Sequence, residues 1–191
     1  KHLIALILIL FVFLSCLRST AHAGDRPVGD PAVRPLQPWI AALVGDASGA
    51  SPTLEGLLRR LVCSPVIVHL DDDVPPGAGF DGRTRFVGAA GSHRYLKVDI
   101  RRASPRASAA GLLAHELQHV VEAVDGEVWD VDSFRQLFQR IGHPQLAIGP
   151  GYFETREALA IGLRTAESSP SPGRGSRGVE SPTRPWDIGR D

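Results

Sequence analysis

The sequence has little cysteine and no surplus of either charge. Of its two cysteines, only Cys63 lies outside the first 23 residues, so no disulfide can form within the remainder of the chain. Lys plus Arg and Asp plus Glu both number 21, which gives a formal net charge of zero. Without a basic surplus the chain lacks the electrostatic footprint of a nucleic-acid binder. We therefore expect no nucleic-acid partner, and stability must come mainly from buried apolar surface.

No apolar run in the sequence is long enough for a typical membrane span, which needs about 20 residues. Residues 3–14 are apolar and follow Lys1, and an Ala-His-Ala site ends this segment at Ala23. A basic start, a short apolar core and a small-residue cleavage site are typical of a secretory signal peptide. We predict a signal peptide over residues 1–23 and export to the periplasm, the cell envelope or the medium. An uncleaved N-terminal anchor is the alternative.

The residues after the predicted cleavage site suffice for one domain and hardly for two. Residues 24–38 carry four prolines and little apolar pattern, which predicts an extended leader. Residues 168–191 are rich in Ser, Pro and Gly, and such a composition buries too little apolar area to offset the entropy of ordering. We therefore predict a single domain over residues 39–167, a disordered tail, and a monomer without a membrane span once the signal is removed.

Within this domain, helical and strand patterns are mixed and predict an α+β fold, with a short mixed or antiparallel sheet packed on a helix. Ser51 before Pro52 and Ser104 before Pro105 are signals for the start of a helix. Gly126 is a signal for the end of the second of these helices. The expected helices cover residues 39–44, 51–63, 104–125, 133–141 (with Ser133 and Gln136 as a capping box) and 152–166, and the expected strands cover residues 65–70, 83–89 and 93–100.

Three adjacent aspartates, Asp71 to Asp73, follow the first predicted strand. They lack the alternating ligands and the distal glutamate of an EF-hand calcium loop. We therefore predict a solvated turn at this position.

The segment "LLAHELQHVVEAVDG" carries the clearest chemical signal. His115 and His119 are four residues apart, so on a helix both imidazoles reach one ion from the same face. Glu116 lies at the flank of that face, where its carboxylate can reach a metal-bound water without being a ligand. A separate apolar stripe fixes the helix in the core: Leu113, Leu117, Val120 and Val124. This pattern predicts a site for one Zn²⁺ ion; the alternative is an ordinary helix with two polar-face histidines.

A catalytic zinc site needs a third protein ligand and leaves its fourth position to water. A metzincin would have Gly at position 122 and His at position 125, whereas this chain has Glu122 and Asp125. Glu122 is one turn beyond His119. It is expected either to support a metal ligand without binding the metal or to lie at the surface. The candidates for the third ligand are Glu122, His143, Glu154 and Glu157, of which the last two lie on a predicted separate helix, 35 and 38 residues after His119.

These residues carry a family resemblance. The motif from His115 to His119, followed by a helical glutamate, resembles the gluzincin branch of the zincin metallopeptidases. The segments "TRFVGAAGSHRYLKVDI", "LLAHELQHVVEA" and "GYFETREALAIGLR" are similar to small uncharacterised secreted bacterial proteins with a His-Glu-Leu-Gln-His helix and a later Phe-Glu-Thr segment. The resemblance covers the whole predicted domain. It implies that Glu154 is the third ligand, with Glu157 in reserve.

The predicted chemistry is hydrolysis of peptide bonds, with Glu116 as the general base for a metal-activated water. An oxyanion would need one further donor. Tyr152 is the first candidate because it is near Glu154, followed by Tyr95, His143 and Arg156. A peptide or protein substrate is expected to pair with an exposed edge of the predicted hairpin. The rival prediction is a secreted, zinc-stabilised binding module of the cell envelope without catalysis.

Overall fold

The computed structural model describes residues 31–102, 108–145, 149 and 151–168. The expected signal peptide and residues 169–191 of the expected tail lie outside this part of the chain. The described strands are β1 (Val33–Pro35), β2 (Val66–Asp71), β3 (Gly82–Ala90), β4 (His93–Ile100), β5 (His143–Pro144) and β6 (Phe153–Glu154). The described helices are α2 (Pro38–Ala50), α3 (Pro52–Val62), α4 (Ala109–Asp125), α5 (Val131–Ile141) and α6 (Arg156–Ser168).

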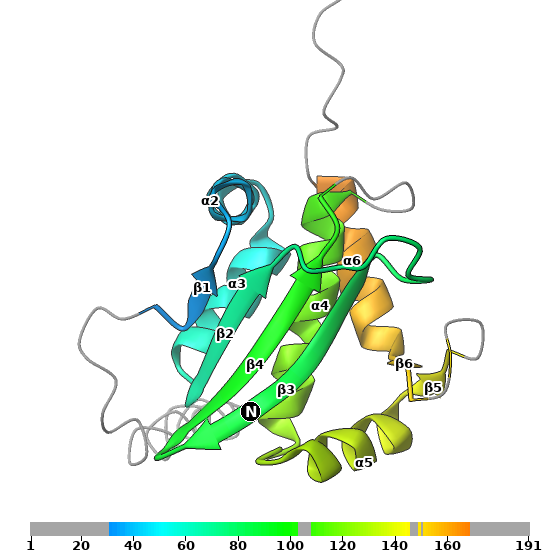
Figure 1. Ribbon diagram of the computed structural model, residues 1–191. Coiled ribbons are helices and arrows are strands. Elements are labelled where there is room, and N and C mark those ends of the chain that lie inside the picture. The colour runs from blue at the N-terminus through cyan, green and yellow to red at the C-terminus, as the bar shows by residue number, and fades with distance from the viewer. Residues whose placement is uncertain (1–30, 103–107, 146–148, 150, 169–191) are drawn as a thin grey trace, which may run out of the picture.

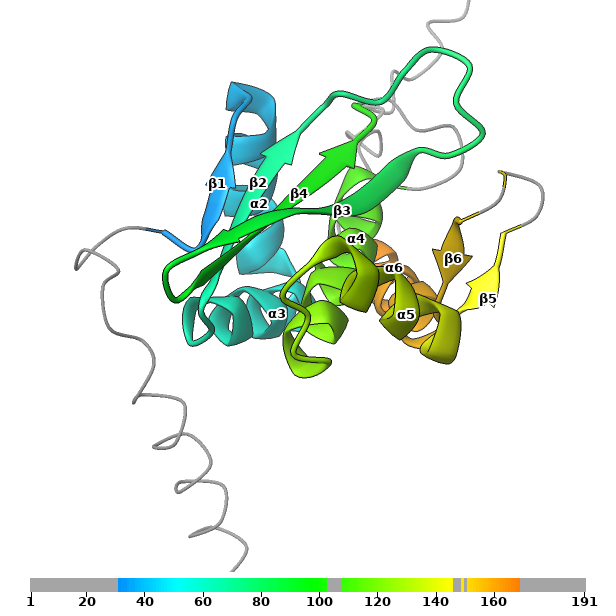
Figure 2. The same cartoon turned by 60° about the horizontal axis from the view of Figure 1, so that its bottom comes forward.

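A four-stranded mixed sheet with the order β1-β2-β4-β3 forms one layer of the fold. β1, β2 and β4 are parallel, whereas β3 is antiparallel to β4 and occupies an edge. α2, α3, α4 and α6 cover one face of the sheet, and α5 lies below the β3 edge (Figures 1 and 2). β5 and β6 form a separate small hairpin. The expected α+β class is confirmed, as is the predicted β3–β4 hairpin.

The expected leader, residues 24–38, is in part a portion of the folded domain. Val33 to Pro35 form β1, which pairs with β2 from Val68 to Leu70, and the side chain of Ala32 is buried. The segment is extended as predicted, but its backbone groups are used in the sheet. The prolines of this segment argued against a strand in the sequence. Proline is nevertheless tolerated on an edge strand, and β1 lies at an edge of the sheet.

α4 lies in the centre of the core. Leu96, Val98 and Ile100 alternate along β4 and face the helices, and all three are buried. The predicted apolar stripe of α4 meets them, with Leu113 and Leu117 completely buried. The helix is enclosed on most of its circumference, so its polar residues are held in a desolvated position as well. Among the described helices, none has both the length and the apolarity to cross a membrane.

Two helices begin at other residues than the sequence predicts. Ser108 is the N-cap of α4 and accepts a hydrogen bond from the Gly111 N–H at 3.1 Å; the predicted cap, Ser104, lies outside the described residues. The capping box of α5 consists of Asp130 and Ser133, not Ser133 and Gln136. Its helix starts three residues earlier because Asp130 is itself a strong N-cap.

The last helix also differs from its prediction. It was expected over residues 152–166, but α6 begins at Arg156 and β6 precedes it. Thr155 accepts a hydrogen bond from the Ala158 N–H at 3.1 Å, as a helix N-cap does. Glu154 therefore lies on a short strand directly before the helix.

α4 and α6 approach each other closely at two glycines. A Cβ atom on Gly111 would lie 2.8 Å from the carbonyl oxygen of Gly162, and a Cβ atom on Gly162 would lie 3.1 Å from the Cβ of His115. Only residues without a side chain allow this separation. The crossing places the start of α6, and with it β6, beside the two histidines of α4.

We predict that Gly111→Ala lowers the free energy of unfolding by roughly 1–3 kcal/mol, because the new methyl group forces the two helices apart. Urea unfolding measures this change. Gly56→Ala is the matched control, since a Cβ atom at that position of α3 meets nothing within 4 Å; it should stabilise the protein by about 0.5–1 kcal/mol. Equal stability of Gly111→Ala and the wild type would contradict the proposed helix contact.

Candidate metal centre

His115, His119 and Glu154 converge on one point between α4 and β6. One ligand atom from each lies within 4.8 Å of the others. His115 Nε2 is 3.1 Å from Glu154 Oε2, and His119 Nε2 is 3.4 Å from Glu154 Oε1. Zinc bonds of about 2.1 Å in a tetrahedron separate neighbouring donors by about 3.4 Å. The three residues could therefore hold one metal ion between them.

The other candidates for the third ligand lie elsewhere. Glu157 is on the outer side of α6, where its exposed carboxylate pairs with Arg164 at 3.2 Å. His143 is opposite Glu154 in the β5–β6 register, but its side chain is exposed. Glu154 is therefore the acidic residue that the fold brings to both imidazoles, although it does so from a strand.

Glu122 has a role that the sequence left undefined. Its Oε2 lies 2.9 Å from His119 Nδ1, and its Oε1 accepts a hydrogen bond from Thr155 Oγ1 at 2.7 Å. A carboxylate on the far ring nitrogen fixes both the orientation and the tautomer of a metal-binding histidine. Because Nδ1 is engaged in this way, Nε2 of His119 is left facing Glu154. Thr155 was not predicted as a site residue.

Glu116 lines the same cavity as the three candidate ligands and is contacted by the edge strand β3. Its side chain is almost fully buried, and Thr84 Oγ1 lies 2.8 Å from its Oε2. Gly82 leaves room for the carboxylate, since a Cβ atom there would be 2.5 Å from Glu116 Oε1. The sequence gave no signal for Thr84 or Gly82, which are more than 30 residues from the motif and reach it only through the packing of β3 on α4.

The charged groups of the cluster shift one another strongly. Burial tends to lower the pKa of His119, but hydrogen bonds to Glu122 and Glu154 outweigh burial and raise this pKa to about 10. Burial tends to raise the pKa of Glu154, but hydrogen bonds from His115 and His119 lower it to about 2. Burial raises the pKa of Glu116, with the two histidines opposing that shift.

The charge balance of this cluster favours a bound cation. Glu116, Glu122 and Glu154 supply three carboxylates, whereas the two imidazoles are neutral when they act as metal ligands. Uncompensated carboxylates in a buried position are costly. A divalent cation between the imidazoles and Glu154 would offset most of this charge. The donor set, two nitrogens and one oxygen, is the set found in catalytic zinc sites.

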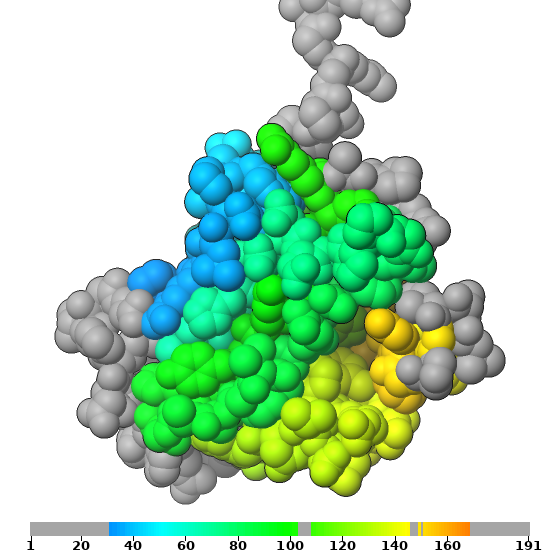
Figure 3. Space-filling view, viewed as in Figure 1, coloured from blue at the N-terminus to red at the C-terminus, as the bar shows by residue number. Residues whose placement is uncertain are grey.

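The cluster forms part of a cavity of about 670 Å³. In Figure 3 its mouth opens between β3 and the segment comprising α5 and β6. Tyr152 lines this cavity, with its ring 5.4 Å from that of Phe80. Tyr95, His143 and Arg156, the other predicted oxyanion donors, are not among the described residues of the lining. Its apolar walls come from six aromatic residues: Phe80, Phe86, Phe134, Phe138, Tyr152 and Phe153.

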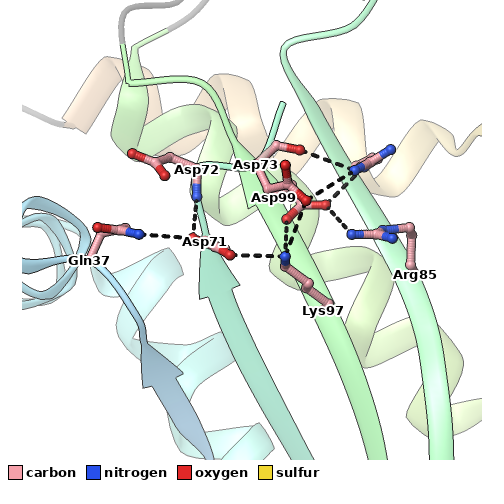
Figure 4. A network of polar contacts seen from close by, with 8 residues as sticks. Gln37, Asp71, Asp72, Asp73, Arg85, Lys97 and Asp99 are labelled. Carbon is pink, nitrogen blue, oxygen red and sulfur yellow. Dashed lines mark hydrogen bonds and ion pairs between the residues drawn. The ribbon is translucent and has the colours of Figure 1, made fainter. Parts of the chain in front are cut away.

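Asp71 and Asp73 belong to an ion-pair network on the open face of the sheet, and Asp72 is joined to it by a hydrogen bond from its N–H to Asp71 (Figure 4). Asp71 pairs with Lys97 at 2.9 Å. Asp99, which is completely buried, pairs with Arg83 at 2.8 Å and with Arg85 at 2.7 Å. Asp71 is the last residue of β2 and pairs with Lys97, so it belongs to the sheet and not to the predicted solvated turn, and Asp72 and Asp73 lie in an irregular loop. The network joins β2, β4 and β3, and it keeps the cavity-lining edge strand in place.

No protein-family model, curated protein or solved structure matches the chain. The functional interpretation therefore depends on the geometry of the site.

We predict that Glu154→Gln lowers zinc affinity by more than the roughly 10- to 100-fold typical of residues that only support a ligand, because it removes a charged donor. Competition with a chromogenic chelator measures the dissociation constant. Glu157→Gln is the matched control. Glu157 lies in the first turn of α6 and is exposed, so this variant should bind zinc as the wild type does. Full affinity in Glu154→Gln would exclude it as the third ligand.

Proposed function

We propose that this chain is a secreted zinc-dependent metallopeptidase, with His115, His119 and Glu154 as the zinc ligands. The observation that carries the proposal is the position of Glu116: a buried carboxylate in the cavity, held by Thr84 next to the three candidate ligands. A structural zinc site closes all four positions with protein ligands and has no use for such a group. Secretion rests on the signal peptide predicted from residues 1–23.

Zinc, when bound, supplies an activated water and polarises the substrate carbonyl. Glu116 is the general base: its carboxylate, with Oε2 2.8 Å from Thr84 Oγ1, accepts the proton of the water. The same carboxylate then passes this proton to the leaving amine. Glu122 and Thr155 orient His119 throughout.

The shape of the cavity supports a peptide as substrate. β3 is the edge strand of the sheet, and its residues from Gly82 to Phe86 line the cavity. An extended peptide can add to such an edge through main-chain hydrogen bonds. The aromatic walls favour apolar side chains beside the scissile bond. Tyr152 lies in the same wall, where its hydroxyl can donate to the oxyanion.

We predict that Glu116→Gln retains zinc and loses about 100- to 10,000-fold in the rate of peptide hydrolysis, because the amide cannot accept the proton. Cleavage of a mixed peptide library, followed by mass spectrometry, measures activity, and elemental analysis measures zinc. A zinc-loaded wild type that cleaves none of these peptides would contradict the proposal and favour the non-catalytic binding module. Undiminished hydrolysis by Glu116→Gln would remove its role as the base.

Gly82→Ala tests the placement of the same carboxylate. We expect kcat to fall by about 100-fold, a loss typical of a catalytic group displaced by about 1 Å, while zinc content is unchanged. Gly88→Ala is the matched control on the same strand, because a Cβ atom there meets nothing within 4 Å and Gly88 is not in the cavity lining. Equal losses in both variants would attribute the effect to the strand and not to Glu116.

A further inference from the structure

Thr155 occupies the junction between β6 and α6 and is almost completely buried, with 3% of its surface exposed. Its main-chain N–H donates a hydrogen bond to Glu154 Oε1 at 2.8 Å. Its hydroxyl accepts from the Ala158 N–H at 3.1 Å and donates to Glu122 Oε1 at 2.7 Å. One residue thus contacts a candidate ligand directly and a second one through Glu122.

The groups at the two ends of this chain of hydrogen bonds, a main-chain N–H and a carboxylate, determine which atom donates in each bond. The Ala158 N–H can only donate, so the hydroxyl of Thr155 must accept there and has its single proton free for Glu122. An ionised carboxylate can only accept. Glu122 therefore accepts one hydrogen bond from Thr155, and His119 Nδ1, 2.9 Å from its other oxygen, must be the donor of a second. With its proton on Nδ1, a neutral His119 has its lone pair on Nε2, which faces Glu154.

A helix cap alone does not require this arrangement. Capping α6 uses only the acceptor function of the hydroxyl, and the donor function would be satisfied equally well by water if the side chain were exposed. Here the donor is buried and directed at the carboxylate that holds His119. The hydroxyl therefore joins the start of α6 to the ring of a residue on α4.

We propose that Thr155 is a positioning residue that orients His119 toward the metal through Glu122. The inference rests on the proposed zinc site and goes beyond it, because it assigns part of the metal affinity to a residue that touches neither the metal nor a histidine. Thr155 acts by fixing which oxygen of Glu122 faces His119. Without the hydroxyl, Glu122 Oε1 keeps only the longer contact from Gln118 Nε2 at 3.5 Å, which holds the carboxylate, and through it the imidazole, less firmly.

The test is the zinc dissociation constant of four full-length proteins: the wild type, Thr155→Val, Glu122→Gln and the double variant. We expect Thr155→Val and Glu122→Gln each to weaken binding by about 10- to 100-fold. Because both act through the same carboxylate, the double variant should be little weaker than Glu122→Gln alone. Thr155→Ser, which keeps the hydroxyl, should restore affinity to within a few-fold of the wild type.

A second cap controls for simple loss of helix stability. Ser51 is the buried N-cap of α3 and accepts from the Leu54 N–H, so Ser51→Ala should lower the unfolding midpoint and keep the zinc affinity of the wild type. Thr155→Ala replaces Thr155→Val if the latter does not fold.

Unchanged zinc affinity in a folded Thr155→Val or Thr155→Ala protein would overturn the inference and leave the zinc site intact. Independent, additive losses in the double variant would overturn it as well, since Thr155 would then act on Glu154 or on the helix. A wild type that binds no zinc at all would remove the proposed function, and this inference with it.

Discussion

The close crossing of α4 and α6 is the constraint on which the candidate site depends. The two histidines come from one helix, but the third candidate ligand comes from the segment that leads into the other. Gly111 and Gly162 allow the helices to approach until their backbones are in contact. This separation puts Glu154 within 3.4 Å of both imidazoles. The site is therefore a property of a helix pair and not of the HExxH motif alone.

Each carboxylate around this centre is held by a different partner, and the partners separate their roles. Glu154 faces the two imidazoles, Glu122 is fixed by Thr155, and Glu116 is fixed by Thr84. These partners lie on α4 itself, on the β6–α6 junction and on β3. The same three acidic residues without these hydroxyl and imidazole partners would be a repulsive cluster in a desolvated region.

Much of the fold followed from local patterns in the sequence. Helical spacing, β-branched runs and the turn between Ala90 and His93 predicted α3, α4, β2 and the β3–β4 hairpin, because these signals act within a few residues. The helix starts were less accurate, since Asp130 and Ser133 both suit an N-cap, and in the structure Asp130 is the cap and Ser133 the other half of its capping box. β1 was missed because its pairing with β2 involves residues more than 30 positions away.

The candidate site, like the fold, could be predicted only where its residues lie close together in the sequence. His115, Glu116 and His119 share one helical turn and were identified from their spacing, whereas Glu154 required a family resemblance. Thr84, Gly82 and Thr155 have no pattern of their own, because their roles arise from contacts between distant elements. The assignment of Glu154 to a helix was wrong because Thr155, the residue after Glu154, is the N-cap of α6.

An uncovered edge strand is also a hazard, because its unpaired backbone is a template for aggregation with another sheet. β3 limits this hazard in two ways. Arg83 and Arg85 place charges along the strand, and the pairing register shifts between Phe86 and Gly88, which interrupts the flat ladder. Only the short stretch before this irregularity remains straight enough to accept a partner strand. The features that would limit the growth of a fibril thus leave room for the single peptide strand proposed as substrate.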